Sequence, residues 1–139
     1  MTHTARDVMT PDPVSLSAQT SLSDAARLMR DRDIGDVLMV RDDLLLGIVT
    51  DRDIVVRGLA ANLDPETTPI ERCCSGNLVV VRADDRIGDV VRLIRDMAIR
   101  RVPVTDDGHL VGIVSLGDLA RQRDPDSALA AISAAPANH

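Results

Sequence analysis

Short apolar runs alternate with amphipathic stretches along this chain, and the pattern predicts strands separated by helices. Residues 4–9 form a short helical lead-in, and the turn cluster that follows contains two prolines and ends it. A brief strand at 14–16 comes next. Thr20 or Ser21 then caps an amphipathic helix that reaches about residue 32, because apolar side chains recur there at helical spacing.

The next segment predicts a β-hairpin. Apolar runs of strand length occupy 36–41 and 44–49, and the acidic pair Asp42-Asp43 forms a tight turn between them. A helix is then expected at about 52–60. Residues 61–69 contain two prolines and few apolar side chains, which is typical of a short linker.

The strongest pattern is an internal duplication. The segment Gly47-Ile48-Val49-Thr50-Asp51-Arg52-Asp53 recurs 65 residues later as Gly112-Ile113-Val114-Ser115-Leu116-Gly117-Asp118. The register holds without a gap from 5–54 onto 70–119, with identical pairs such as Val14/Val79, Asp24/Asp89, Leu28/Leu93, Ile34/Ile99 and Val37/Val102. A motif that repeats with matching apolar patterns on both sides indicates a tandem-repeat fold.

The second half therefore predicts the same elements as the first. Strands are expected at 78–81, 101–105 and 110–114, a turn at 106–108, and helices at 85–98 and 116–123. The Ala-rich end of the chain adds at most a helical turn or two at 127–134.

Each strand–helix–strand–strand–helix repeat has about 50 residues, near the lower size limit for an independent core. We therefore expect a mixed α/β (α+β) fold in which two βαββα repeats pack face to face with pseudo-twofold symmetry. The domain boundaries that follow are 5–60 and 70–123, joined by the linker 61–69 and followed by the tail 124–139.

Composition excludes several classes of function. The chain of 139 residues is 45% apolar but has no Phe, Tyr or Trp, so an aliphatic core is expected and the stacking platforms of single-strand nucleic-acid binders are missing. A net charge of −6 also argues against nucleic acid or an anionic membrane as a partner. Because the pattern contains neither a transmembrane run nor a signal peptide, we expect a cytoplasmic protein.

The sequence offers no motif for catalysis or metal binding. The three histidines lack ligand spacing to one another and to Cys73-Cys74, and no nucleophile, phosphate-loop or dinucleotide motif occurs. We expect no enzymatic activity, no metal and no cofactor. The adjacent cysteines align with apolar residues of the first repeat and are expected to be small buried hydrophobes; a thiol sensor or a vicinal disulfide is the alternative.

The duplicated motif has the chemistry of a nucleotide site. Each copy ends a strand with a hydroxyl, Thr50 or Ser115, at the start of a helix whose amides favour a phosphate. Asp53 or Asp118 follows three residues later, and its carboxylate can accept hydrogen bonds from both ribose hydroxyls. The glycine that opens each motif permits a close backbone approach or an unusual torsion.

A purely structural alternative exists for both turns. Thr50 and Ser115 can act as helix N-caps, and Asp53 and Asp118 can compensate the helix dipole in the first turn. We favour ligand contact, because capping accounts for one copy well and for two copies less well: Glu would serve a cap as well as Asp. On this hypothesis Asp53 is a solvated cleft residue whose replacement costs little stability.

The chain resembles a tandem pair of cystathionine-β-synthase (CBS) domains, a Bateman module, over about residues 5–123. The resemblance rests on the two Gly-to-Asp motifs and on Arg101-Val102-Pro103-Val104, and residues 50–65 further resemble small stand-alone bacterial members. It implies a regulatory module that binds AMP, ADP, ATP or an adenosyl compound in the cleft between the repeats. A homodimer and an effector protein are the expected partners.

The resemblance also implies two unequal clefts. In related modules, a basic residue just before the Val-Pro-Val-like strand reaches the phosphate of the nucleotide whose ribose the other repeat holds. Arg100 and Arg101 occupy these positions here, and their first-repeat counterparts are Gly35 and Asp36. One cleft thus combines Thr50, Asp53 and Arg101, with Thr10 and Val14 near the base; the other combines Ser115 and Asp118 with Asp36, a poor neighbour for a phosphate. An exposed strand edge paired with surface acids is the alternative for Arg100 and Arg101.

We therefore expect a non-enzymatic sensor of an adenosine-containing ligand. Two other interpretations stay open. One is a dimeric stress-response or interaction protein that keeps the fold with vestigial clefts. The other is a redox or metal sensor that uses Cys73-Cys74.

Overall fold

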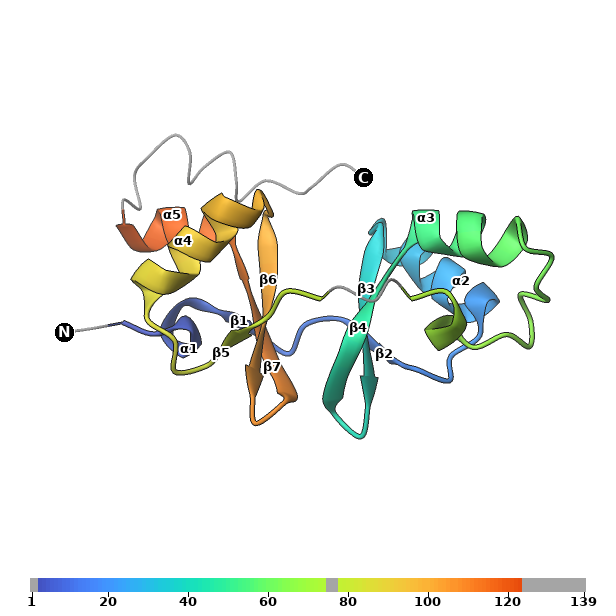
Figure 1. Ribbon diagram of the computed structural model, residues 1–139, viewed down its shortest axis with the longest axis horizontal. Coiled ribbons are helices and arrows are strands. Elements are labelled where there is room, and N and C mark those ends of the chain that lie inside the picture. The colour runs from blue at the N-terminus through green and yellow to red at the C-terminus, as the bar shows by residue number, and fades with distance from the viewer. Residues whose placement is uncertain (1–2, 75–77, 124–139) are drawn as a thin grey trace. The chain divides into compact units, whose positions relative to one another are not determined.

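The protein is described by a computed structural model that covers residues 3–74 and 78–123 and divides into two compact units (Figure 1). Residues 14–78 form the continuous unit. Residues 3–13 and 79–123 form the composite unit, which joins the start of the chain to its second half. The tail 124–139, with the helical turn expected at 127–134, lies outside the described residues.

The continuous unit is a small sheet with helices on one side. Strand β2 runs parallel to β3, and β3 pairs antiparallel with β4. Figure 1 shows α2 and the helix after β4 side by side next to this hairpin. The elements are β2 (Ser15–Ser17), α2 (Leu22–Arg32), β3 (Asp36–Arg41), β4 (Leu44–Thr50), α3 (Asp51–Asp53), the π-helix η1 (Ile54–Leu59) and the 3₁₀ turn η2 (Ile70–Arg72).

The composite unit repeats this plan. Strand β5 runs parallel to β6, and β6 pairs antiparallel with β7, whose other edge carries the short antiparallel strand β1. The elements are α1 (Ala5–Val8), β1 (Thr10–Pro11), β5 (Val81–Arg82), α4 (Ile87–Met97), β6 (Arg101–Asp106), β7 (His109–Ser115) and α5 (Leu116–Arg123). The expected mixed α+β fold with two βαββα units is confirmed.

Local chemistry sets the ends of these elements. The Ser21 hydroxyl accepts a hydrogen bond from the Asp24 amide at 3.1 Å, which caps α2 as expected. Asp33 and Ala98, which are equivalent in the two repeats, end α2 and α4 in the left-handed conformation. In the β3–β4 turn both Asp42 and Asp43 have positive φ, and such a turn matches the twist of a hairpin.

Each unit has its own aliphatic core. In the continuous unit, the helix α2 and the hairpin β3–β4 bury Leu22, Val37 and Val49 together with Ile70 and Cys73 from the start of the second repeat. In the composite unit, Ala5 from the start of the chain joins the cluster of Val81, Val90, Ile94, Val102, Val104, Val114 and Leu119. Aliphatic side chains, methionine and cysteine fill these cores, as the composition predicts.

The two lead-in segments, residues 4–9 and 69–74, are exchanged between the repeats. The Ala5 amide donates to the Asp85 carbonyl at 2.8 Å, and its counterpart, the Ile70 amide, donates to the Thr20 carbonyl at 2.8 Å. Each lead-in therefore belongs to the compact unit of the other repeat. The compact units differ in this way from the sequence repeats 5–60 and 70–123.

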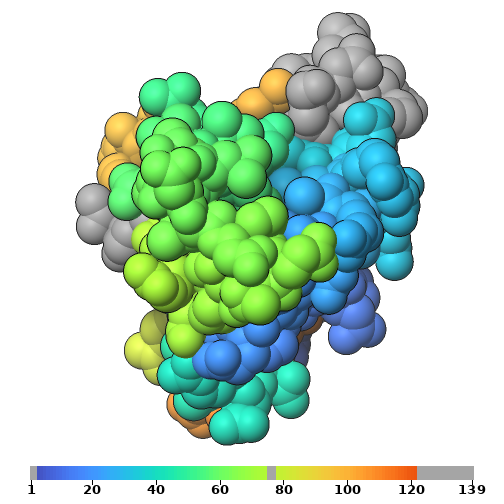
Figure 2. All heavy atoms as spheres, turned by 90° about the vertical axis from the view of Figure 1, so that its right-hand side faces the viewer, coloured from blue at the N-terminus to red at the C-terminus, as the bar shows by residue number. Residues whose placement is uncertain are grey.

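The expected linker 61–69 packs closely on α2. The Leu22 amide donates to the Thr68 carbonyl at 3.0 Å, and the Ser23 amide donates to the Pro65 carbonyl at 2.9 Å. Thr68 is buried. Figure 2 looks onto this face, where the yellow-green segment lies against the blue α2. The segment thus supplies carbonyl acceptors for the N-terminus of α2.

Three elements differ from the pattern-based expectations. Two residues of the proline-containing turn cluster form β1, and the strand expected at 78–81 begins only at Val81. The helix expected at 52–60 is a π-helix over Ile54–Leu59. Gly58 lies where this helix meets α2, since a Cβ there would be 2.8 Å from Cδ1 of Leu22. None of the helices in the described part of the chain is long and apolar enough to cross a membrane.

Candidate functional site

The first copy of the motif forms a tight turn from β4 into α3. The Thr50 amide donates to Oδ2 of Asp53 at 3.0 Å, and the Asp53 amide donates to Oγ1 of Thr50 at 3.0 Å. The other carboxylate oxygen of Asp53 lies 3.5 Å from Nε of Arg57, one turn further on. Only 10% of the Asp53 side chain is exposed.

The second copy repeats this geometry between β7 and α5. The Ser115 amide donates to Oδ2 of Asp118 at 2.9 Å, and the Asp118 amide donates to the Ser115 hydroxyl at 3.1 Å. Arg121 pairs with Oδ1 of Asp118, whose side chain is 9% exposed. Both units therefore present a hydroxyl, a carboxylate and an arginine at the same turn.

These bonds are the capping arrangement that we considered as an alternative. The view of Asp53 as a solvated cleft residue is wrong, because its side chain is buried and completes a capping box. Capping and ligand binding are chemically compatible. A carboxylate offers about four lone-pair positions, and a hydroxyl that accepts one hydrogen bond still has its own proton to donate.

The glycines that open the motifs allow a close approach, as expected. A Cβ on Gly47 would lie 2.5 Å from Sγ of Cys74. A Cβ on Gly112 would lie 2.3 Å from Sδ of Met9 and 2.9 Å from the carbonyl oxygen of Thr10. Neither glycine has a positive φ, so close contact with the exchanged lead-in is what requires glycine here.

The other predicted site residues fall into the two units as follows. In the composite unit, Arg101 is exposed and is the direct strand partner of Ser115, and the Arg100 carbonyl accepts from the Leu116 amide at 2.9 Å. Thr10 is exposed on β1, opposite Ile113. These residues therefore share a unit with Asp118.

In the continuous unit, Asp36 is the direct strand partner of Thr50, and the Gly35 carbonyl accepts from the Asp51 amide at 2.9 Å. Val14 is exposed just before β2. The structure thus brings Asp36, Thr50 and Asp53 together. Within the units, Asp36 lies beside the Thr50–Asp53 turn, and Arg101 lies beside the Ser115–Asp118 turn.

The adjacent cysteines are structural in this arrangement. Cys73 is fully buried in the continuous unit, as expected for a small hydrophobe, and the Cys74 thiol donates to the Ile48 carbonyl at 3.4 Å. Burial raises the pKa of both thiols, and the nearby Asp53 carboxylate adds to this effect. Across residues 3–74 and 78–123, no three His, Cys, Asp or Glu side chains gather where they could hold a metal ion.

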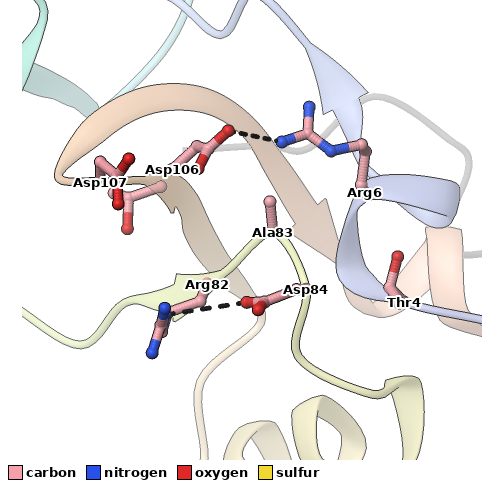
Figure 3. A pocket seen from close by; sticks show the side chains of 8 residues that line it. Thr4, Arg6, Arg82, Ala83, Asp84, Asp106 and Asp107 are labelled. Atoms are coloured by element: carbon pink, nitrogen blue, oxygen red, sulfur yellow. Dashed lines mark hydrogen bonds and ion pairs between the residues drawn. The ribbon is translucent and has the colours of Figure 1, made fainter.

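A polar hollow of about 230 Å³ lies in the composite unit between the lead-in, the end of β5 with the turn that follows it, and the tip of the β6–β7 hairpin (Figure 3). Two ion pairs lie in its lining: Arg6 with Asp106 at 2.8 Å, which joins the lead-in to the hairpin, and Arg82 with Asp84 at 3.7 Å, within one segment. Sequence reasoning missed these residues. The available signal was a charge reversal, since Arg6 and Asp106 correspond to Glu71 and Arg41 at the 65-residue spacing.

Comparison with known proteins agrees with this geometry. The chain is similar to Hypoxic response protein 1 of Mycobacterium tuberculosis, with 40% identity over 119 residues that cover 85% of this chain and 83% of that protein. It is also similar to the Bacillus subtilis CBS domain-containing protein YhcV, with 36% identity over 92% of this chain and 91% of that protein.

Two solved structures share the fold. The crystal structure of Hypoxic Response Protein I with two coordinated zinc ions has a TM-score of 0.76 and 39% identity, covering 86% of this chain and 98% of that one. The structure of CBSX2 in complex with AMP has a TM-score of 0.71 and 27% identity, covering 87% and 96%. The family model for the CBS domain matches residues 5–59 and 66–124. The chain therefore belongs to the CBS-domain family, as a tandem pair of these domains.

Proposed function

We propose that this chain is a non-enzymatic regulatory module that binds an adenosine-containing ligand at its strand-to-helix turns. The observation that carries the proposal is the duplicated turn, in which Thr50–Asp53 and Ser115–Asp118 arrange a hydroxyl, a carboxylate and helix N-terminal amides in the same way. CBS-domain proteins are generally regulatory. A similar protein, CBSX2, has been solved with AMP, which supports an adenine nucleotide as the ligand class.

Each residue has a distinct role in this proposal. Asp53 and Asp118 accept hydrogen bonds from the ribose hydroxyls, and the hydroxyls of Thr50 and Ser115 donate to a phosphate oxygen. Arg101, with Arg100 beside it, supplies positive charge to the phosphate. Thr10 and Val14 are assigned to the base. AMP, ADP and ATP act as regulatory ligands here, so no step of chemistry is assigned to them.

The test is equilibrium binding by titration calorimetry on the full chain, because the sequence has no Trp to report binding. We expect AMP, ADP or ATP to bind with micromolar dissociation constants, about −8 kcal/mol, and GMP to bind much more weakly. Mass spectrometry of small molecules released from the purified protein identifies a ligand that is retained. If AMP, ADP, ATP and S-adenosylmethionine all fail to bind at millimolar concentration, the interaction-protein interpretation replaces this one.

We assign the homodimer contact to the π-helix. Val55, Val56 and Leu59 are about half exposed on it, whereas the counterparts of the first two in the second repeat are Ala120 and Arg121. The first repeat thus exposes three large apolar side chains where the second has a small residue and an arginine, and such an exposed apolar stripe indicates that a second copy covers it. Leu59→Glu should convert a dimer to a monomer in sedimentation experiments, and a wild-type monomer would contradict the assignment.

A zinc site is the second candidate, because the similar Hypoxic Response Protein I was solved with two coordinated zinc ions. The donors that the structure describes do not fit such a site, because Cys73 is in the core and these residues include no cluster of three donors. A zinc titration distinguishes the candidates, since stoichiometric binding that Cys74→Ala abolishes would favour zinc.

A further inference from the structure

An ion pair fixes each exchanged lead-in to the tip of a hairpin, and the two pairs have opposite polarity. Arg6 of the first lead-in donates to Asp106 at 2.8 Å, as Figure 3 shows. At the equivalent place in the continuous unit, Arg41 of the hairpin donates to Glu71 of the second lead-in at 2.6 Å. The repeats thus keep the contact but interchange the charges.

The backbone hydrogen bonds of the lead-ins do not distinguish one repeat from the other. The Arg6 amide donates to the Ala83 carbonyl at 3.0 Å, and its counterpart, the Glu71 amide, donates to the Ala18 carbonyl at 3.3 Å. These donors and acceptors are backbone groups, and they are equivalent in the two repeats. The spacers between each lead-in and its own repeat are also of equal length, because the register has no gap. Backbone hydrogen bonds alone therefore do not decide which repeat a lead-in packs on, and the decision is left to its side chains: the apolar ones, Ala5 in one core and Ile70 in the other, and the charged ones.

The charges do distinguish them. In the observed arrangement both lead-ins face a hairpin of opposite charge. If each lead-in packed on its own repeat instead, Arg6 would face Arg41 and Glu71 would face Asp106. Both contacts would then bring like charges together, which is unfavourable even for exposed groups.

We infer that the reversed ion pairs Arg6–Asp106 and Glu71–Arg41 select the exchanged packing of the lead-ins over packing on their own repeats. All four side chains are partly exposed, so each pair alone contributes little. The selection comes from the difference in electrostatic energy between the observed packing, with two attractive contacts, and the alternative packing, with two repulsive ones. Specificity in this form uses repulsion in the wrong pairing as much as attraction in the right one.

The experiment interchanges the charges in stages. Arg6→Glu/Glu71→Arg makes both observed contacts repulsive and both alternative contacts attractive. Arg41→Glu/Asp106→Arg does the same from the hairpin side. The four-site variant that combines all these changes makes the observed contacts attractive again. Arg30→Asp/Asp31→Arg, which interchanges a pair within α2, is the matched control.

Two measurements follow each variant: urea unfolding, and methyl NOEs from Ala5, which lies in the Val102/Val104/Val114 cluster of the wild type. We expect each two-site variant to lower the folding equilibrium constant about tenfold and to weaken these NOEs or move them to the Val37/Val49 cluster. The four-site variant should restore the NOEs and most of the stability, because it recovers both ion pairs and loses only the hydrogen bond that Gln19 donates to Glu71 at 3.0 Å. High salt should reduce the differences, because the Debye length is about 3 Å at 1 M. The inference is overturned if the two-site variants keep wild-type stability and NOEs, or if the four-site variant is not restored.

Discussion

Thr50 and Asp53 each bind the other's backbone amide, both at 3.0 Å, so the hydroxyl and the carboxylate of the candidate site also hold the start of a helix. Removal of the carboxylate therefore affects folding as well as binding. Asp53→Ala should lower the free energy of unfolding by about 0.5–2 kcal/mol, the usual cost of a lost cap. Asp53→Asn should cost less, because its amide oxygen can still accept from Thr50. Urea denaturation of both variants checks this, and a stability-neutral Asp53→Ala would show that the cap contributes nothing.

Asp53→Asn is for the same reason the better probe of ligand binding. It keeps an acceptor for the cap but loses the charge that strengthens hydrogen bonds to ribose hydroxyls, each worth about 1.5–3 kcal/mol. We expect AMP affinity to fall by tenfold or more in calorimetry. Asp118→Asn is the matched variant in the other unit. Unchanged AMP affinity in both variants would remove the two carboxylates from the proposed site.

Arg101 should matter more for phosphorylated ligands than for adenosine. Arg101→Ala should weaken AMP binding but leave adenosine binding nearly unchanged, because only AMP carries the phosphate that the guanidinium would neutralise. Asp36→Arg should create or strengthen a second phosphate site, since it replaces the acidic counterpart. Calorimetric stoichiometry for AMP and adenosine measures both effects. Two identical sites in the wild type, with equal losses in Arg101→Ala and Asp118→Ala, would contradict the inequality of the clefts.

Substitution of the motif glycines should disturb the lead-ins. In Gly112→Ala the new methyl would meet the Thr10 carbonyl as well as Met9, and backbone cannot rotate away. In Gly47→Ala it would meet only the side chains of Cys74 and Met39. We expect Gly112→Ala to lower the melting temperature more. Gly88→Ala is the control: nothing lies within 4 Å in α4, so it should stabilise by up to about 1 kcal/mol.

The cysteine thiols should control stability at alkaline pH, because the sequence contains no Lys or Tyr that would titrate there. Burial raises the folded pKa of Cys73 and Cys74 above the ordinary 9.0. Their contribution is therefore complete below pH 9.0 and is lost as the pH rises towards the folded pKa. Urea midpoints between pH 8 and 11 should fall in the wild type and fall less in Cys74→Ala. Thiol reagents should label the folded protein more slowly than the unfolded chain, and rapid labelling at pH 7 would revive the redox interpretation.

Patterns along the chain were sufficient for the hairpins and the long helices. The strands around Asp42-Asp43 and the Ser21-capped helix depend on neighbouring residues, so local periodicity predicts them. The π-helix over Ile54–Leu59 could not be predicted in this way. The helix packs closely on α2 at Gly58 and Leu22, a contact between segments distant in sequence that local periodicity does not contain.

The residues of the candidate site could be predicted from the sequence, but their burial and packing could not. Duplication of the Thr50–Asp53 turn singled out the hydroxyl and carboxylate, and both turns have the same geometry. The burial of Asp53 could not be read from the motif, because it depends on tertiary packing around a residue that is usually exposed. The exchange of the lead-ins was also hidden, since Arg6 and Asp106 are far apart in the sequence.

Because the lead-ins are exchanged, the two units can fold at different times during synthesis. All described residues of the continuous unit lie in one stretch, so this unit can close on the ribosome soon after Cys74 has emerged. The composite unit combines residues 3–13 with residues 79–123. Residues 4–11 leave the ribosome before the rest of this unit but must wait for β7 before β1 can pair. These residues are thus synthesised early in the unit but can pack only late.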